Sequence, residues 1–312
     1  MMFVKVYFNN ILIFFLNSFF ITGFNGFIGK NLIKYFSSDF SFVKYDKTSP
    51  VIIQGEIVLH LAGKAHDLKN ISNSSEYYQV NTELTKTVFD AFLASNSKVF
   101  IILSSVKAVA DEVEDYLTED HIPNPITHYG KSKLLAEQYI LSKPIPQGKR
   151  VYILRPCMIH GPGTKGNLNL LYKVVSKGIP WPLGLFDNKR SFCSIDNLMF
   201  IIKELIERDD IASGVYNVSD DLPLSTNDVI SILAESQNRN AKIWKVSKDL
   251  IRSLAKLGDV LRLWLTTERL QKLTESYVVS NQKIKSAIGK DLQVSAKEGL
   301  LKTFNSFQTN AQ

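Results

Sequence analysis

The stretch Thr22-Gly23-Phe24-Asn25-Gly26-Phe27-Ile28-Gly29 decides the fold of this chain. Its glycines follow the pattern G-x-x-G-x-x-G, and each has a separate task. Gly23 permits a tight turn, Gly26 lets the backbone approach a pyrophosphate, and Gly29 lets a following helix pack closely on a preceding strand. The start of such a helix presents free N–H groups and a partial positive charge to phosphate. We expect a dinucleotide to be bound by Gly23, Asn25, Gly26, Phe27, Ile28 and Gly29.

The residues on either side of this loop support the prediction. Phe19–Thr22 is a short apolar run with the length of a strand, and Ile28–Phe36 has apolar residues at helical spacing. A phosphate loop of the ATPase or kinase type needs Gly, four residues, and then Gly-Lys-Ser/Thr. Here Phe24 stands at the first glycine position and Asn31 replaces the hydroxyl residue, which excludes that alternative.

Short apolar runs and longer amphipathic runs continue to alternate toward the middle of the chain. This rhythm predicts an α/β fold, a Rossmann-type doubly wound parallel sheet. Because the apolar runs lack polar alternation, we expect helices on both faces of the sheet. The further predicted strands are Phe42–Tyr45, Ile57–Ala62, Val99–Leu103 and Val151–Leu154, and the predicted helices are Asn81–Ala94 and Lys131–Leu141.

The pattern changes after about residue 157. Loops rich in Gly and Pro appear, and helical runs follow at Thr226–Glu235 and Lys248–Leu263. We therefore predict a smaller, mostly helical C-terminal substrate domain that closes over the carboxyl edge of the sheet, where ligands of open α/β sheets bind. The predicted parts are a dinucleotide-binding Rossmann domain over 18–160, to which a segment near 190–220 returns, and a substrate-binding region formed by 161–189 and 221–312.

Composition narrows the class of protein. Apolar residues make up 45% of the 312 residues, enough for a sizeable core, and the formal net charge is +7. That charge is either an ordinary solvated surface or an attraction for an anionic small molecule. The Lys residues are scattered rather than clustered with aromatic residues, so nucleic-acid binding is not expected. Cys157 and Cys193 lack metal-ligand spacing, and we expect two buried, reduced thiols in a cytoplasmic protein.

The N-terminal residues 1–17 form an apolar extension whose role the sequence does not decide. They resemble a signal peptide or a membrane anchor, but Asn9, Asn10 and Asn17 interrupt the apolar run. No small-residue cleavage site follows, and the first strand of the glycine loop starts directly afterwards. A peripheral membrane contact through residues 1–16 is the less favoured alternative to a packed or flexible tail.

Asp46 ends the second predicted strand, 17 residues after Gly29. A carboxylate there accepts hydrogen bonds from the adenosine ribose and repels a 2′-phosphate, which favours NAD over NADP. Lys47 opposes this choice because a cation could pair with that phosphate, so NADP stays open. The competing interpretation of Asp46 is a turn-forming residue at a strand end.

Three residues carry the candidate chemistry. Ser105 follows the predicted buried strand Val99–Leu103, and Tyr129 and Lys133 share one helical face because they are four residues apart. Exchange of hydride between an alcohol and a ketone needs a proton donor and acceptor beside the carbonyl oxygen. A nearby ammonium and a nicotinamide cation would lower the pKa of Tyr129 from about 10 toward the working pH. Ser105 would hydrogen-bond the same oxygen.

Taken together, these motifs resemble the extended short-chain dehydrogenase/reductases of the NAD-dependent epimerase/dehydratase family. The resemblance spans residues 18 to roughly 300. Its matching elements are Thr22–Gly29, His60-Leu61-Ala62-Gly63, Asn81, Ser104-Ser105, Tyr129 with Lys133, Leu154-Arg155-Pro156, Gly161-Pro162-Gly163, Arg190-Ser191-Phe192 and Asp196-Asn197-Leu198.

The resemblance implies roles at the matched positions. Tyr129 would be the acid/base, Lys133 would hold the nicotinamide ribose, and Ser105 would orient the substrate. The resemblance also implies a homodimer built through Asn81–Ala94 and Lys131–Leu141. The implied further cofactor contacts are Leu61, Ala62 and Pro156, the implied contacts to a substrate diphosphate are Asn167 and Arg190, and Lys64 and His66 are further candidates for the substrate pocket.

One departure from the family pattern guides the choice of reaction. Sugar 4,6-dehydratases of this family carry Thr-Asp-Glu where this chain has Ser105-Val106-Lys107, so dehydration is disfavoured. We expect C4 epimerisation of a UDP-hexose or UDP-N-acetylhexosamine through a 4-keto sugar, in bacterial surface-polysaccharide synthesis. The alternatives are an NAD(P)H-dependent reductase of a 4-keto-6-deoxy nucleotide sugar and, more remotely, a non-catalytic nucleotide-binding scaffold. The region from Asp46 to Glu56 is short, so the usual third strand is expected to be reduced or missing.

Overall fold

A six-stranded parallel sheet forms the centre of the computed structural model, with strand order β2-β1-β3-β4-β6-β9. The structure describes residues 18–46, 49–64, 73–164, 166–263 and 265–309. The strands are β1 (Ser18–Thr22), β2 (Ser41–Lys44), β3 (Ile57–His60), β4 (Val99–Leu103), β6 (Arg150–Pro156) and β9 (Gly214–Val218). The predicted parallel sheet is therefore confirmed.

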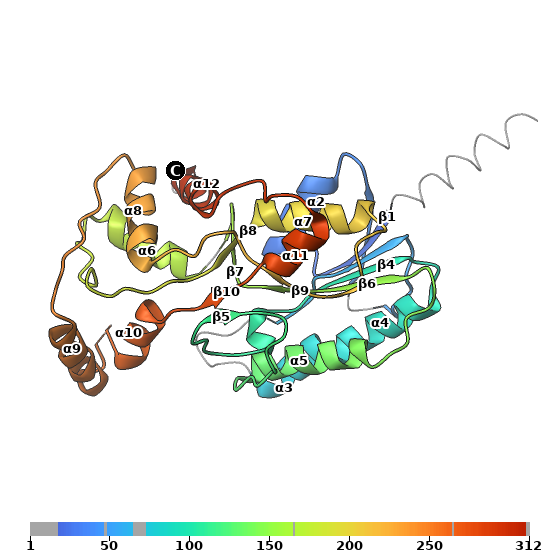
Figure 1. Cartoon of the computed structure of the whole chain (residues 1–312), viewed down its shortest axis with the longest axis horizontal. Coiled ribbons are helices and arrows are strands. Elements are labelled where there is room, and N and C mark those ends of the chain that lie inside the picture. Colours follow the sequence, from blue (N-terminus) through green and yellow to red (C-terminus); the bar gives the residue numbers. More distant parts are fainter. Residues whose placement is uncertain (1–17, 47–48, 65–72, 165, 264, 310–312) are drawn as a thin grey trace, which may run out of the picture.

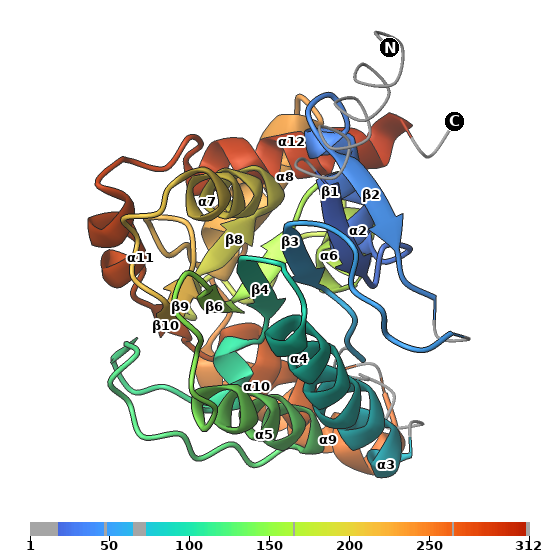
Figure 2. The same ribbon diagram turned by 90° about the vertical axis from the view of Figure 1, so that its right-hand side faces the viewer.

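Helices cover both faces of this sheet, as the apolar strands require. On one face lie α2 (Phe27–Phe36) and α7 (Ile195–Glu207), and on the other lie α4 (Leu84–Ala94) and α5 (His128–Leu141) (Figures 1 and 2). α4 continues from a short helix, α3 (Ser74–Tyr77), through the π-turn η1 (Tyr78–Glu83). The fold is thus a Rossmann-type sandwich of three layers.

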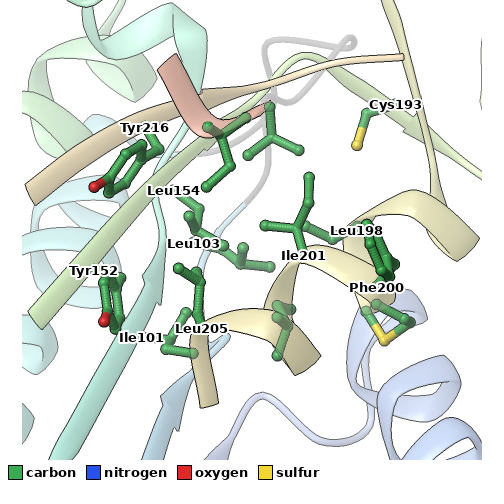
Figure 3. Close-up of a cluster of buried hydrophobic side chains, with 14 of the residues drawn as sticks. Ile101, Leu103, Tyr152, Leu154, Cys193, Leu198, Phe200, Ile201, Leu205 and Tyr216 are labelled. Atoms are coloured by element: carbon green, nitrogen blue, oxygen red, sulfur yellow. The ribbon is translucent and has the colours of Figure 1, made fainter. Parts of the chain in front are cut away.

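The larger core cluster lies between the sheet and α7. Figure 3 shows side chains of α7, Leu198 and Ile201 among them, against those of β4 and β6, including Leu103 and Leu154. All four are at most 5% exposed. A second cluster on the opposite face joins Phe100 of β4 to the helices α4 and α5. Burial on both faces explains why these strands read as unbroken apolar runs.

The sheet stops at β2. Among the described residues no strand pairs with its outer edge, in agreement with the expectation that the third strand of this fold is missing. Other boundaries moved slightly. The helix expected from Lys131 begins at His128, because the Thr127 side chain accepts a hydrogen bond from the Gly130 N–H and caps the first turn.

The C-terminal half supplies the helices α6 (Asn167–Ser176), α8 (Thr226–Ser236), α9 (Lys248–Leu261), α10 (Thr267–Thr274), α11 (Gln282–Ile288) and α12 (Ala296–Thr309). α6, α8 and α12 share one apolar cluster that includes Leu168, Leu233 and Phe304. α9 and α10 share another, which includes Ile251 and Leu270. Two short sheets complete the region: β5 (Tyr116–Leu117) pairs with β10 (Val278–Val279), and β7 (Met158–His160) pairs with β8 (Phe192–Ser194).

No helix of the described residues is both long and apolar enough to cross a membrane. The apolar extension at residues 1–17 lies outside the described part of the chain, so the prediction about it stays a prediction.

Candidate active site

The candidate residues meet at one edge of the sheet because its strands run parallel. The carboxyl ends of β1, β3, β4 and β6 therefore lie side by side. The residues that follow them on this edge are Gly23, Leu61 and Ser104-Ser105, and Pro156 ends β6 itself.

The first turn is built tightly around Gly23. Its φ of +71° lies in the left-handed region, and a Cβ atom added to it would stand 2.5 Å from the Ala62 nitrogen. Gly29 is equally constrained, since a Cβ there would stand 2.5 Å from the Gly23 carbonyl oxygen. The glycine loop is thus pressed against the loop after β3 on one side and against its own helix on the other.

The beginning of α2 is available to an anion. Its N-cap residue, Gly26, has no side chain to cap the helix, and the first turn of α2 holds no acidic residue. Asn25 and Gly26 are exposed, whereas Phe27 and Ile28 are half-buried. Uncapped N–H groups at an exposed helix start are what a pyrophosphate needs, so the observed loop fits a dinucleotide.

A buried hydrogen-bond chain ties this turn to the neighbouring elements. The Thr22 hydroxyl lies 2.8 Å from Nδ1 of His60 and accepts from the Ala62 N–H, while Nε2 of His60 lies 2.9 Å from the Thr85 hydroxyl. Burial, reinforced by the charge of Lys133, lowers the pKa of His60 to about 3. His60 is therefore a neutral structural link, which the sequence pattern alone did not reveal.

Asp46 lies on the same edge. Ile21 of β1 is paired with Lys44 of β2. Asp46 lies two residues after Lys44, and Gly23 lies two residues after Ile21, so both residues follow their strands at the same edge. The Asp46 side chain is exposed. Lys47, which argued for NADP, lies outside the described residues.

The Lys64 backbone is held by Asn81, and the Lys64 ammonium already has a carboxylate partner. The Asn81 Oδ1 atom accepts from the Lys64 N–H at 2.8 Å, and its Nδ2 atom donates to the Ser132 hydroxyl at 2.9 Å. The Lys64 ammonium pairs with Glu76. Asn81 lies in the π-turn η1, an arrangement that helices use to redirect a side chain at functional sites. His66, the other pocket candidate of this loop, lies outside the described residues.

Ser105 and Tyr129 come together as expected. A side-chain hydrogen bond joins them, and the Tyr77 ring packs edge-on against Tyr129 with centroids 6.3 Å apart. Burial nevertheless raises the pKa of Tyr129, although the Ser105 hydrogen bond lowers it. For the protein's own groups, desolvation of the phenolate outweighs that hydrogen bond, and the lowering expected from an ammonium together with a nicotinamide cation stays a prediction.

Lys133 lies one turn further along α5 and is 6% exposed. Its ammonium donates to the Leu103 carbonyl at 2.8 Å, and a Cβ atom on Gly63 would stand 3.0 Å from it. Burial lowers its pKa from 10.5 to about 8, while Glu137 raises it. At neutral pH Lys133 is therefore a buried cation between the Gly63 backbone and the end of β4.

Glu137 is the residue that the sequence analysis missed here. Its carboxylate binds the Arg155 guanidinium, with a shortest distance of 2.5 Å, and accepts from the Ser104 hydroxyl. All three groups are buried. The spacing of four residues from Lys133 could have revealed it, since the two side chains share a face of α5.

Arg190 lies in a second group of charges on the substrate side. It pairs with Glu275 at 2.8 Å and donates to the Lys272 carbonyl. The adjacent Lys107 ammonium lies 4.0 Å from the centre of the Tyr277 ring and donates to the Asp111 carbonyl. Burial lowers the pKa of both Lys107 and Arg190.

Asn167 is the other expected diphosphate contact. It begins α6 and is exposed. Lys107 was noted in the sequence only as a departure from dehydratases. The structure places it two residues after Ser105, between that residue and Arg190, which makes it a further cation of the site.

Comparison with known proteins agrees with this geometry. The model of the NAD dependent epimerase/dehydratase family matches residues 19–219. The UDP-glucose 4-epimerase of Vibrio cholerae is 34% identical over 244 residues, which cover 69% of this chain and 74% of that protein. The N-acetyl-alpha-D-glucosaminyl-diphospho-ditrans,octacis-undecaprenol 4-epimerase of Escherichia coli O157:H7 is 29% identical over 84% of this chain and 83% of its own length.

A reductase and a solved epimerase are also similar. The GDP-6-deoxy-D-mannose reductase of Pseudomonas aeruginosa is 26% identical over 69% of this chain and 79% of that protein. The structure of a UDP-glucuronic acid 4-epimerase from Bacillus cereus in complex with NAD matches with a TM-score of 0.73 and 18% identity, over 95% of this chain and all of that one. The extent of the family match leaves one conclusion: this chain is an enzyme of the NAD-dependent epimerase/dehydratase family with the extended short-chain dehydrogenase/reductase fold.

Proposed function

We propose that the protein interconverts the C4 epimers of a UDP-linked hexose or N-acetylhexosamine. The observation that carries the proposal is the hydrogen-bonded pair of Ser105 and Tyr129 with the buried cation Lys133 one turn away. The UDP-glucose 4-epimerase of Vibrio cholerae supports the choice of substrate. Lys107 stands where dehydratases of this family carry an acid, which argues against elimination of water.

The described residues fit a dinucleotide, and they divide into two groups. The N–H groups of the glycine loop and of α2 would hold the pyrophosphate, and Asp46 would bind the adenosine ribose. Leu61, Ala62 and Pro156 would contact the rest of the dinucleotide. Lys133 would donate to the nicotinamide ribose. Bound NAD supplies the hydride acceptor and donor for the sugar C4, together with a positive charge near the site.

The chain's own residues move the proton. Tyr129 Oη would take the proton of the sugar 4-hydroxyl and, after the 4-keto sugar has turned, return it to the C4 oxygen while the hydride adds to the other face of C4. Ser105 would donate to the same sugar oxygen and hold it in place. A raised pKa keeps Tyr129 protonated at rest, so the phenol is ready to act as the acid, while acting as the base requires a nearby positive charge.

Arg190 and Lys107 would bind the substrate's diphosphate. Both are cations in partly desolvated positions, and the Lys107 N–H donates to the Ser105 hydroxyl. A guanidinium presents paired donors that suit phosphate oxygens. Asn167 would reach the same diphosphate from α6, and Lys64 would line the sugar pocket. We place this chemistry in the cytoplasm, as one step of bacterial surface-polysaccharide synthesis.

A Tyr129→Phe variant tests the assignment of the acid/base. Incubation of the protein with NAD and UDP-glucose or UDP-N-acetylglucosamine should give the C4 epimer without net change in NAD absorbance. The variant should bind NAD normally by calorimetry and lose about a thousandfold in turnover. Tyr78→Phe is the matched control, because it removes a phenol whose hydroxyl lies 3.0 Å from His128 and outside the proposed machinery. Near-normal turnover of Tyr129→Phe would overturn the assignment.

The second candidate is reduction of a 4-keto-6-deoxy nucleotide sugar, which the similar Pseudomonas aeruginosa reductase favours. The same three residues would then act in one direction only. Net loss of NAD(P)H absorbance with such a substrate, without epimer formation from UDP-sugars, would support it. Silence in both assays with NAD bound would support the non-catalytic scaffold instead.

The assembly belongs to the same proposal. We expect a homodimer through α4 and α5, which lie next to each other on one face of the sheet (Figure 2). α5 also exposes Leu135 and Leu141. Light scattering of the purified protein should give twice the mass of one chain, and a monomer would contradict this expectation.

A further inference from the structure

The helix α9 has an apolar face that is only half covered by protein. One row of its residues, Ile251, Ala255 and Gly258, is buried against α10 and the neighbouring cluster. A second row next to it consists of Leu250, Leu254, Leu257 and Leu261, which are between 45% and 58% exposed. Spacings of four, three and four residues place these four leucines on one face of the helix.

The remaining face of α9 is basic. Lys248, Arg252 and Lys256 follow one another at intervals of four residues on the side away from the leucine row. Residues 242–262 contain six Lys or Arg residues and only two carboxylates, Asp249 and Asp259. Asp249 pairs with Arg252 at 3.4 Å, and Asp259 accepts from the Thr267 hydroxyl and N–H. The exposed part of this segment is therefore both apolar and cationic.

This segment lies at the edge of the molecule. Figure 1 shows α9 at the far left, with α10 between it and the rest of the chain. Trp244, just before α9, is also exposed, as are Val260 and Leu263 at its other end. Exposed apolar residues gathered on one surface indicate an interaction site.

We propose that α9 docks on an anionic membrane surface, with its leucine row in the acyl boundary and its cations at the headgroups. An interfacial helix of this kind combines a large apolar face with a Lys- and Arg-rich face. The cations complement anionic phospholipid, whose surface attracts clustered Lys and Arg residues. α9 has 14 residues, too few to span a bilayer, so it would lie in the plane of the surface.

A second copy of the chain is the competing occupant, and the net charge of the segment disfavours it. Two copies joined at the leucine row would each bring a segment with six cations and only two carboxylates. Like net charges on two partners oppose association. An anionic lipid surface carries the opposite charge and therefore attracts the six cations.

Docking through α9 would bring the membrane close to the candidate active site. α10 packs on α9, and the Lys272 carbonyl and Glu275 carboxylate at its end hold Arg190. A membrane contact at α9 would therefore place the substrate-diphosphate end of the enzyme within two helices of the lipid surface. The docking itself does not depend on the proposed function, and its test needs no substrate.

A fluorescent label on α9 tests the proposal in the full-length protein. Leu257→Cys carries an environment-sensitive nitrobenzoxadiazole, and the two native cysteines are buried and would not compete for it. Vesicles of phosphatidylcholine with phosphatidylglycerol should raise the emission severalfold and shift it to the blue. Ile122→Cys, at the most exposed large apolar residue among those described, is the matched control and should show little change.

Three results would overturn the proposal. The first is no change in emission with anionic vesicles. The second is an equal change at position 122. The third is a rise on adding unlabelled protein without vesicles, which would indicate pairing with a second copy. In co-sedimentation, Leu250→Glu with Leu257→Glu should lower the bound fraction about tenfold, because both leucines lie outside the buried row of α9. A retained helical signal by circular dichroism separates this loss from unfolding.

Discussion

The acid/base role proposed for Tyr129 depends on how two buried groups of α5 respond to desolvation. Burial raises the pKa of Tyr129 and lowers that of Lys133 to about 8, so both shifts favour the neutral form. A Tyr and a Lys four residues apart could be predicted from the sequence, because one helical face is a matter of spacing. The direction of the Tyr129 shift could not, because it depends on how closely the surrounding elements exclude water.

The pH dependence of the free energy of unfolding should reflect the buried ammonium of Lys133. Its pKa is about 8 in the folded protein against an ordinary 10.5, so between these values the unfolded chain binds more protons. The free energy of unfolding should therefore rise with pH across this window, by a few kcal/mol more in the wild type than in Lys133→Met. Urea titrations at several pH values from about 7 to 10 measure the difference in slope. Parallel slopes for the two proteins would mean that Lys133 is better solvated than its position indicates.

Among the elements, the strand-turn-helix unit of β1 and α2 could be predicted most fully from the sequence. Its glycines are local signals, and the structure shows the close contacts that they were expected to allow. The buried links around it could not be predicted in the same way. His60 and Thr85 meet Thr22 only because β3 and α4 pack beside β1. Lys107 and Tyr277 meet although they are far apart in the chain, which no spacing rule reveals.

Substitution at Gly23 should separate backbone strain from packing. Gly23→Ala combines a left-handed φ with backbone overlap at Ala62, so we expect a loss of about 2–5 kcal/mol in stability and loss of NAD binding. Gly148 is the matched control, because its φ is +82° and an added Cβ would meet nothing within 4 Å. Gly148→Ala should cost only about 1–2 kcal/mol and leave NAD binding unchanged. Equal losses of stability in the two variants would show that the backbone relieves the overlap with Ala62 without a free-energy cost.

At the scale of the whole molecule, the C-terminal helix α12 joins the β7–β8 sheet to the helices α6 and α8. Thr303 Oγ1 lies 2.9 Å from Nδ1 of His160, at the end of β7, and Gly299 lies against Ser194. The same helix buries Phe304 in the cluster of α6 and α8. The sequence predicted a smaller helical region but not this connection, because contacts between residues more than a hundred positions apart leave no periodic signal.

Removing Phe304 should therefore weaken the whole enzyme. Phe304 is fully buried, and Phe304→Ala should lower the free energy of unfolding by about 3–5 kcal/mol. Because α12 contacts both the β7–β8 sheet and the helices α6 and α8, calorimetry should show one unfolding transition at a lower temperature. Phe307→Ala, at a half-buried position of the same cluster, should have a smaller effect. A separate early transition, with the main transition unchanged, would show that the helices α6, α8 and α12 unfold independently of the central sheet.

The π-turn at Tyr78–Glu83 has a consequence for how this chain tolerates a change in its length. A π-turn is an α-helix carrying one additional residue, and loss of that residue would restore regular winding without breaking the helix. It would also rotate every preceding side chain by about 100° relative to α4. Asn81 would then lose its hydrogen bonds to the Lys64 backbone and to Ser132. Deletion of one residue here should thus keep the helix, together with Ser105, Tyr129 and Lys133, and loosen the loop after β3.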